Sequence, residues 1–175
     1  MVLNEIGSDF WQYDIKDEKN IFWWESSDFF YTYFKSGRNA IKALCKILSM
    51  TNKTVLLPIY TCESVIFPFV EEGWKLCFYH VTKDLQIDID SLEQKYNAVH
   101  PDVVFFHGYF GFDTTRTSMN VLKSLQNKGC ILVEDTTSTL LSDNRTDFAD
   151  YYISSLRKFF AIPDGGILIG KKKFS

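Results

Sequence analysis

The chain has 175 residues, of which 46% are hydrophobic and 23% charged, with a formal net charge of −3. This balance is typical of a soluble, folded domain and excludes a disordered chain, and the interspersed charges exclude a broad basic surface for nucleic acid or anionic membranes. No run approaches the roughly 20 apolar residues of a membrane span, and the opening MVLNEIGSDFWQYD lacks the basic and apolar regions of a signal peptide, so we expect a cytoplasmic protein.

Short apolar runs alternate with longer amphipathic segments along the chain. In chain order, the pattern predicts strands at 54–58, 74–79, 103–107, 130–134, 151–154 and 166–170, and helices between them at 38–50, 64–72, 91–96 and 115–128. The run VVFFH at 103–107 is apolar throughout, as expected for a strand covered by helices on both faces. No repeat or linker divides the chain. The order therefore predicts a three-layer α/β/α domain with a mostly parallel central sheet.

Polar residues follow several of these strands, at the sheet edge where ligands of open parallel sheets bind. Asp135 closes the run CILVED, where a carboxylate either faces a ligand or caps the next helix. Lys158 follows the strand at 151–154, where a lysine either forms a Schiff base with a carbonyl or lies on the surface. Taken singly, neither residue decides between its two interpretations.

A third candidate element is the segment KSGRNAIKALCKIL, in which Ser36 and Gly37 precede an amphipathic helix. The exposed N–H groups and the dipole of a helix start favour a phosphate, although Ser-Gly is also a common helix cap. No P-loop or dinucleotide-binding glycine pattern is present elsewhere in the sequence. The helix start is therefore a phosphate-binding candidate without a rival motif.

The four cysteines, Cys45, Cys62, Cys77 and Cys130, are widely spaced. They form no CxxC pair and have no neighbouring histidine, so no zinc site is expected. Free cysteines usually pack as small apolar residues. The sequence therefore predicts four buried, reduced thiols and no metal.

Together, the helix start, the aspartate and the lysine resemble the pyridoxal-phosphate (PLP) enzymes of fold type I. Within that group the chain resembles the DegT/DnrJ-type aminotransferases, which act on nucleotide-linked sugars. The resemblance extends from Ser36 to Gly170 and depends on five motifs, of which the last two are the most specific: SGRNAIKAL, VLLPIYTCESV, FFHGYFG, VEDTTS and SLRKFFAIPDGG.

The resemblance implies a role for each motif residue. Lys158 would form the internal aldimine with PLP and then move the substrate proton, while Asp135 would pair with the pyridine nitrogen. The phosphate would be held by a set of residues near the two ends of the motif region, namely Ser36, Gly37, Arg38 and Ser155, with Ser154 as the alternative to Ser155.

Two departures from the family pattern concern the cofactor ring. Many relatives have a stacking aromatic where this chain has Cys62, which leaves Tyr60 or His107 as the stacking candidates. Ser138 stands where relatives have Gln or His to contact the ring hydroxyl. Both contacts are therefore expected to differ from those of relatives.

The resemblance also implies a fuller protein than this chain, because family enzymes are roughly twice domain size and carry a small C-terminal domain. We expect residues 1–35 to form an N-terminal segment and residues 36–175 an incomplete, apparently truncated PLP-binding large domain. The implied function is a homodimeric aminotransferase that passes nitrogen from an amino donor to a keto sugar nucleotide. The alternative is a non-catalytic relative acting as a scaffold or interaction module, in which the aromatics at 21–34 serve as an interface. Those aromatics equally fit packing against the domain.

Overall fold

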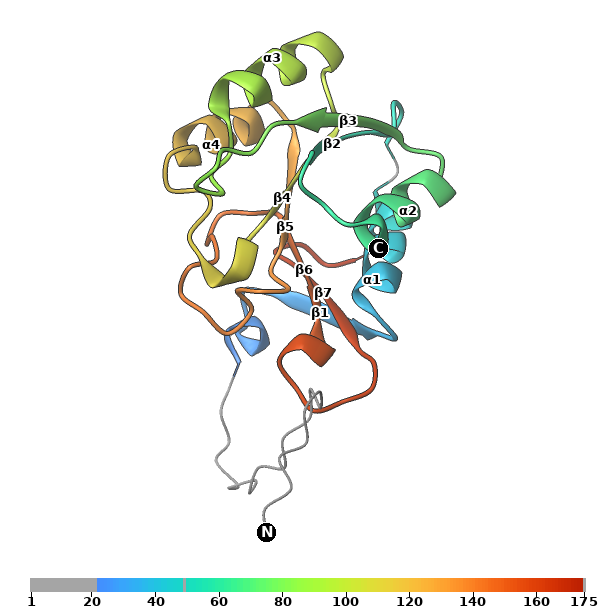
Figure 1. Ribbon diagram of the computed structural model, residues 1–175. Coiled ribbons are helices and arrows are strands. Elements are labelled where there is room, and N and C mark those ends of the chain that lie inside the picture. Colours follow the sequence, from blue (N-terminus) through green and yellow to red (C-terminus); the bar gives the residue numbers. More distant parts are fainter. Residues whose placement is uncertain (1–21, 49, 175) are drawn as a thin grey trace.

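The computed structural model describes residues 22–48 and 50–174. Its helices and strands alternate for most of the chain, and the strands form one central sheet (Figure 1). In chain order the elements are η1 (Trp23–Glu25), β1 (Phe30–Phe34), α1 (Gly37–Ile47), β2 (Thr54–Pro58), α2 (Glu63–Glu71), β3 (Lys75–Tyr79), α3 (Ile89–Val99), β4 (Val103–His107), η2 (Tyr109–Gly111), α4 (Met119–Asn127), β5 (Ile131–Asp135), β6 (Tyr151–Ser155), η3 (Leu156–Lys158) and β7 (Gly166–Gly170).

The seven strands lie in the order β1-β7-β6-β5-β4-β2-β3. Strands β2 to β6 run parallel to one another, whereas β7 is antiparallel to both of its neighbours, β6 and β1. The predicted mostly parallel sheet is confirmed. Because β2, β4, β5 and β6 point the same way, the polar residues that follow them meet at one edge.

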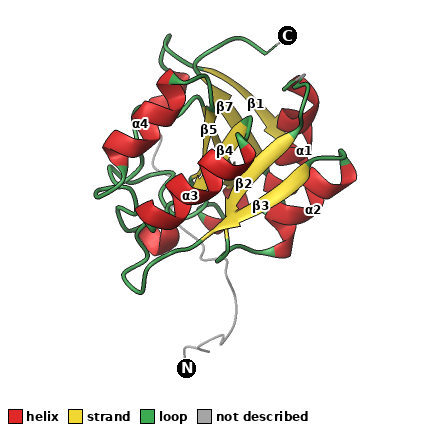
Figure 2. Ribbon diagram, turned by 90° about the horizontal axis from the view of Figure 1, so that it is seen from above, coloured by secondary structure: helices red, strands yellow, loops and turns green. Residues whose placement is uncertain are grey.

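Helices cover both faces of the sheet, which confirms the three-layer arrangement. Helices α1 and α2 lie on one face, and α3 and α4 lie on the other (Figure 2). Side chains of β2 alternate accordingly: Val55 and Leu57 belong to the core beneath α1 and α2, while Leu56 belongs to the opposite core. Since both faces are buried, every residue of β2 is buried, which explains why its sequence, TVLLP, is apolar after Thr54.

Strand β1 was not predicted, although it lies within the segment 1–35. It is an edge strand that pairs with β7, and four of its five residues are exposed. Its sequence, FYTYF, is rich in aromatic residues, which favour strands, but the aromatics at 21–34 were interpreted only as an interface or as packing against the domain. The described part of the predicted N-terminal segment therefore contributes to the sheet, and its first 21 residues lie outside the described range.

All four predicted helices differ somewhat from their observed limits, and two of them start at clearly different residues. Helix α3 is longer than predicted because the Asp88 side chain accepts a hydrogen bond from Ser91 N at 3.0 Å and caps its start. Helix α4 begins only at Met119, since Asp113 Oδ1 accepts from Thr115 N at 3.0 Å and holds the preceding residues in a turn. Side-chain hydrogen bonds of aspartate thus move both helix starts.

The cysteines are not all buried, contrary to prediction. Cys45 and Cys130 are buried and Cys77 is half-buried, but Cys62 is exposed just before α2. Its position after β2 places it at the polar sheet edge rather than in the core. Within the described ranges, no helix is both long and apolar enough to cross a membrane.

Candidate active site

Two adjoining hollows open at the sheet edge where β2, β4, β5 and β6 end. They have volumes of about 340 and 420 Å³, within the range of small-molecule sites. Both are lined by Cys62, Asp135, Thr137 and Lys158, so they form one continuous cleft. This cleft is the candidate active site.

All nine site residues predicted from the sequence line the cleft. Asp135 and Lys158 stand where its two halves join. The first half adds Tyr60, His107 and Ser138, and the second half adds Ser36, Gly37, Arg38 and Ser155. The structure thus brings together residues separated by more than 100 positions, while their individual roles stay predictions.

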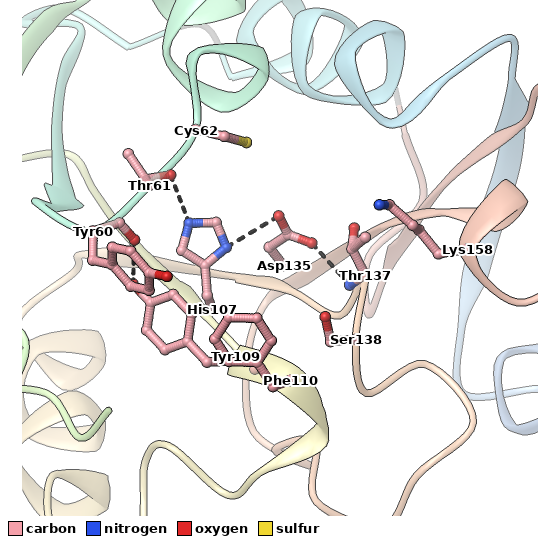
Figure 3. Close-up of a pocket in the computed structure, with 11 residues that line it drawn as sticks. Tyr60, Thr61, Cys62, His107, Tyr109, Phe110, Asp135, Thr137, Ser138 and Lys158 are labelled. Carbon is pink, nitrogen blue, oxygen red and sulfur yellow. Dashed lines mark hydrogen bonds and ion pairs between the residues drawn. The ribbon is translucent and has the colours of Figure 1, made fainter. Parts of the chain in front are cut away.

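Three side chains form a hydrogen-bonded row across the first half of the cleft (Figure 3). His107 Nδ1 lies 3.1 Å from Asp135 Oδ2, and His107 Nε2 lies 2.7 Å from Thr61 Oγ1. The parallel register of β4 and β5 places His107 directly beside Asp135. The imidazole is therefore fixed at both nitrogens, which sets its orientation in the cleft.

Asp135 is buried, and burial by itself raises the pKa of a carboxyl group. The hydrogen bond and charge of His107, together with bonds from Thr137, outweigh this effect and hold the pKa of Asp135 below its ordinary value. Among these bonds, Thr137 N donates to Asp135 Oδ1 at 2.8 Å. Asp135 is consequently a fixed anion at neutral pH, suited to binding a cationic nitrogen.

Lys158 ends the short helix η3, which follows β6 directly. Its amine end is directed toward the side of the cleft that holds Thr137 and Asp135 (Figure 3). The turn is fixed because Leu156 N donates to Gly165 O at 3.0 Å and Phe159 N donates to Leu156 O at 2.9 Å. A primary amine therefore faces the same space as the Asp135 carboxylate.

The second half of the cleft favours an anion. Three basic side chains line it, those of Arg38, Arg157 and Lys158, against one acidic side chain, that of Asp135. The start of α1 also opens into it, where the N–H groups of Gly37 and Arg38 have no partner within the helix. Positive side chains and helix dipole thus act together at this end.

Ser36 caps α1 with its side chain. Its Oγ accepts from Asn39 N at 3.2 Å and donates to Asn39 Oδ1 at 2.7 Å. The hydroxyl proton is therefore engaged inside the helix cap. The backbone amides of the first turn are the donors that remain directed out of the helix.

The structure separates the two serines that precede Lys158. Ser154 is fully buried and its hydroxyl lacks a partner among the described residues, whereas Ser155 lines the cleft. Successive residues of a strand face opposite sides, so only one of the two reaches the cleft. Ser155 is the serine placed to contact a ligand.

The sequence analysis gave no individual role to several lining residues, above all Tyr109 and Phe110 in η2. The ring of Tyr109 lies 5.2 Å from that of His107 and 5.3 Å from that of Tyr60, centroid to centroid. The hydroxyl of Tyr109 donates to the carbonyl oxygen of Tyr60. Thr61, Thr137 and Arg157 also line the cleft; they follow strands, where a ligand was expected, but they too were given no role. Cys62, which lines both halves, was assigned to the core.

No family model matches the sequence, and no curated protein matches it either. Many solved structures do match the fold. PseC of Helicobacter pylori, an aminotransferase of pseudoaminic acid biosynthesis, has a TM-score of 0.69 at 18% identity, over 82% of this chain and 40% of its own. NtdA of Bacillus subtilis, solved with bound PMP, has a TM-score of 0.68 at 16% identity, over 82% and 34%. Histidinol-phosphate aminotransferase of Clostridium acetobutylicum has a TM-score of 0.66 at 15% identity, over 86% and 48%.

These comparisons establish the fold. The chain has the α/β/α fold of the large domain of PLP-dependent aminotransferases, as the sequence predicted. It spans less than half the length of the structures it matches.

Proposed function

We propose that the chain is the cofactor-binding part of a PLP-dependent aminotransferase of the DegT type. The observation that carries the proposal is the convergence of Lys158 and the charged Asp135 in one cleft whose other end is cationic. A binding role alone does not require an amine and a fixed carboxylate facing the same space. The aminotransferase names of solved structures with this fold support the same conclusion.

The residues of the cleft fit PLP at both of its charged ends. The phosphate suits the cationic half, with Arg38, Arg157 and the first-turn amides of α1 as donors and Ser155 beside them. The pyridine nitrogen suits Asp135, whose lowered pKa keeps it ionised and able to hold a positive ring. Tyr60, His107 and Ser138 remain for the ring and its hydroxyl.

When bound, PLP supplies a carbonyl that takes up amines and a ring that withdraws electrons from the adjacent carbon. Lys158 contributes the amine that holds the cofactor and afterwards carries the substrate proton between two carbons. His107 orients Asp135 through the 3.1 Å contact, and Thr61 fixes the imidazole from its other side.

The substrates we propose are an amino donor and a keto sugar nucleotide, and the assembly we propose is a homodimer. PseC, whose fold this chain shares, is an aminotransferase of pseudoaminic acid biosynthesis and provides a precedent for the sugar assignment. The five motifs that resemble DegT-type enzymes support it from the sequence.

The test adds PLP to the purified chain, reduces the mixture with borohydride, and maps the labelled lysine by mass spectrometry. We expect the label on Lys158 and its loss in Lys158→Ala and Lys158→Arg, the latter of which keeps the charge. Lys83→Ala is the matched control, because Lys83 is exposed and lines neither half of the cleft. Labelling spread evenly over surface lysines would refute the assignment and favour a non-catalytic scaffold.

A further inference from the structure

Phe110 combines two features that are rarely found in one residue. Its backbone has φ 51° and ψ 23°, in the left-handed region, and its side chain is 66% exposed. No other large hydrophobic side chain in the described residues is more exposed. Both features lie at the mouth of the first half of the cleft, which Phe110 lines.

Neither feature stabilises the fold. Left-handed backbone is costly for a residue with a Cβ, and glycine or asparagine adopts it more readily. An exposed phenyl ring gains little from the hydrophobic effect, since most of its surface stays in water. A position that needed only this turn would be filled better by Gly or Asn. Strained residues of this kind cluster at functional sites.

The turn that carries Phe110 is held firmly on both sides. Phe112 N donates to Tyr109 O at 2.8 Å, and Asn144 Nδ2 donates to Gly111 O at 2.7 Å. Gly108 N donates to Asp135 O at 3.0 Å, which ties the start of the turn to β5. The backbone of the turn is therefore fixed at the cleft mouth, and with it the Cα from which the phenyl ring extends.

Phe110 is the outermost of three neighbouring rings, those of His107, Tyr109 and Phe110, and the innermost of them contacts Asp135. His107 contacts Asp135, Tyr109 lies next to His107, and the Phe110 ring follows at 6.5 Å from the Tyr109 ring, tilted by 33°. Figure 3 shows these rings along one side of the cleft, opposite Lys158. The row leads from Asp135 to solvent, so Phe110 at its outer end is accessible to a ligand that enters the cleft.

We propose that Phe110 is a specificity-determining residue that binds the acceptor substrate by stacking on the flat apolar face of a ring. The proposal deepens the proposed function and depends on it for the identity of the acceptor. A pyranose C–H face and a nucleobase share this chemistry, and both occur in a sugar nucleotide. Removing an aromatic that stacks on a base weakens binding by about five- to 150-fold.

The experiment measures binding of UDP-glucose to the full chain by ligand-observed NMR titration, with and without added PLP. We expect Phe110→Ala to raise Kd at least about fivefold, as stacking predicts, and Phe110→Tyr to restore it. Phe112→Ala is the matched control, because Phe112 is 61% exposed, has φ −83°, and does not line the cleft. Its Kd should stay within about twofold, as for a surface change away from the site.

Two simpler probes identify the stacked ring. Loss of affinity for UDP in Phe110→Ala assigns the contact to the base, and loss for methyl glucoside assigns it to the sugar. Phe110→Gly provides an independent readout of strain: its melting temperature should equal or exceed that of the wild type, while its affinity falls. A structural role for the phenyl ring would instead lower the melting temperature.

Three results would overturn the proposal: equal Kd values for wild type and Phe110→Ala, no detectable binding of any probe to the wild type, or an effect of Phe110→Ala on self-association alone, measured by sedimentation. Failure of the proposed function is distinguishable. In that case Lys158 takes up no label from PLP and borohydride, whereas Phe110-dependent ring binding without PLP persists.

Discussion

Replacing Gly166 with alanine tests how β7 holds the start of α1. A Cβ on Gly166 would lie 2.2 Å from Ser36 C, 2.3 Å from Ser36 O and 2.5 Å from Gly37 N. All three atoms belong to backbone, so no side chain can rotate away. The strand and the helix start must therefore separate.

The magnitude follows from two opposing effects. Overpacking costs typically 1–3 kcal/mol, and contacts with backbone place this position at about 3 kcal/mol or above. Alanine also restricts the unfolded chain, which offsets about 0.4–1 kcal/mol. We therefore expect the free energy of unfolding to fall by at least about 2 kcal/mol.

The assay is urea unfolding followed by circular dichroism, with Gly37→Ala as the control. A Cβ on Gly37 would meet its nearest neighbour, Ser155 Cβ, at 3.5 Å, an ordinary contact. That variant should therefore change stability by less than about 1 kcal/mol. A Gly166→Ala protein within about 0.5 kcal/mol of the wild type, the usual range of a surface substitution, would refute the close approach of β7 and α1.

Three further predictions concern buried polar groups. Burial raises the pKa of Glu134 to about 7 despite its hydrogen bonds from Thr146, so the folded state keeps a proton that the unfolded state loses. The free energy of unfolding should fall, by up to about 3 kcal/mol, as pH rises from 4.5 through 7, and urea titrations should find this slope absent in Glu134→Gln. The pKa of Asp135 is lowered, so its stabilisation is present above the ordinary value of 3.8 and is lost below it; acid titration of Asp135→Asn should therefore give a shallower loss. Tyr79→Phe removes a buried hydrogen bond of 3.0 Å to Phe105 O and should cost about 1 kcal/mol in the same unfolding assay.

The sequence was most informative where local pattern and local structure coincide. The predicted strands at 54–58, 103–107 and 166–170 have the observed limits, because each is a short apolar run bounded by polar or turn-forming residues. The Ser-Gly pair before α1 was also predictive, since Ser36 does cap that helix. The fold class followed from the alternation of these elements.

Predictions failed where a partner distant in the sequence decides the local structure. Strand β1 has the strand-favouring sequence FYTYF, but its partner β7 lies more than 130 residues later, and the sequence does not show that pairing. Cys62 was assigned to the core by residue type, but its position after β2 places it at the exposed sheet edge. Composition describes what a side chain prefers, and tertiary structure decides whether that preference is met.

The sequence by itself determined where the site lies, because residues that follow parallel strands meet at one edge whatever the details of packing. It thereby placed Asp135 and Lys158 together. Only the tertiary structure decided how those groups are oriented. The packing of the strands brings Thr61 and Asp135 to opposite nitrogens of His107. The alternation of side chains along β6 directs Ser155, and not Ser154, into the cleft. The backbone hydrogen bonds of η2 fix the turn that carries Phe110. Register, face and turn geometry depend on partners far along the chain, and no local run of residues contains that information.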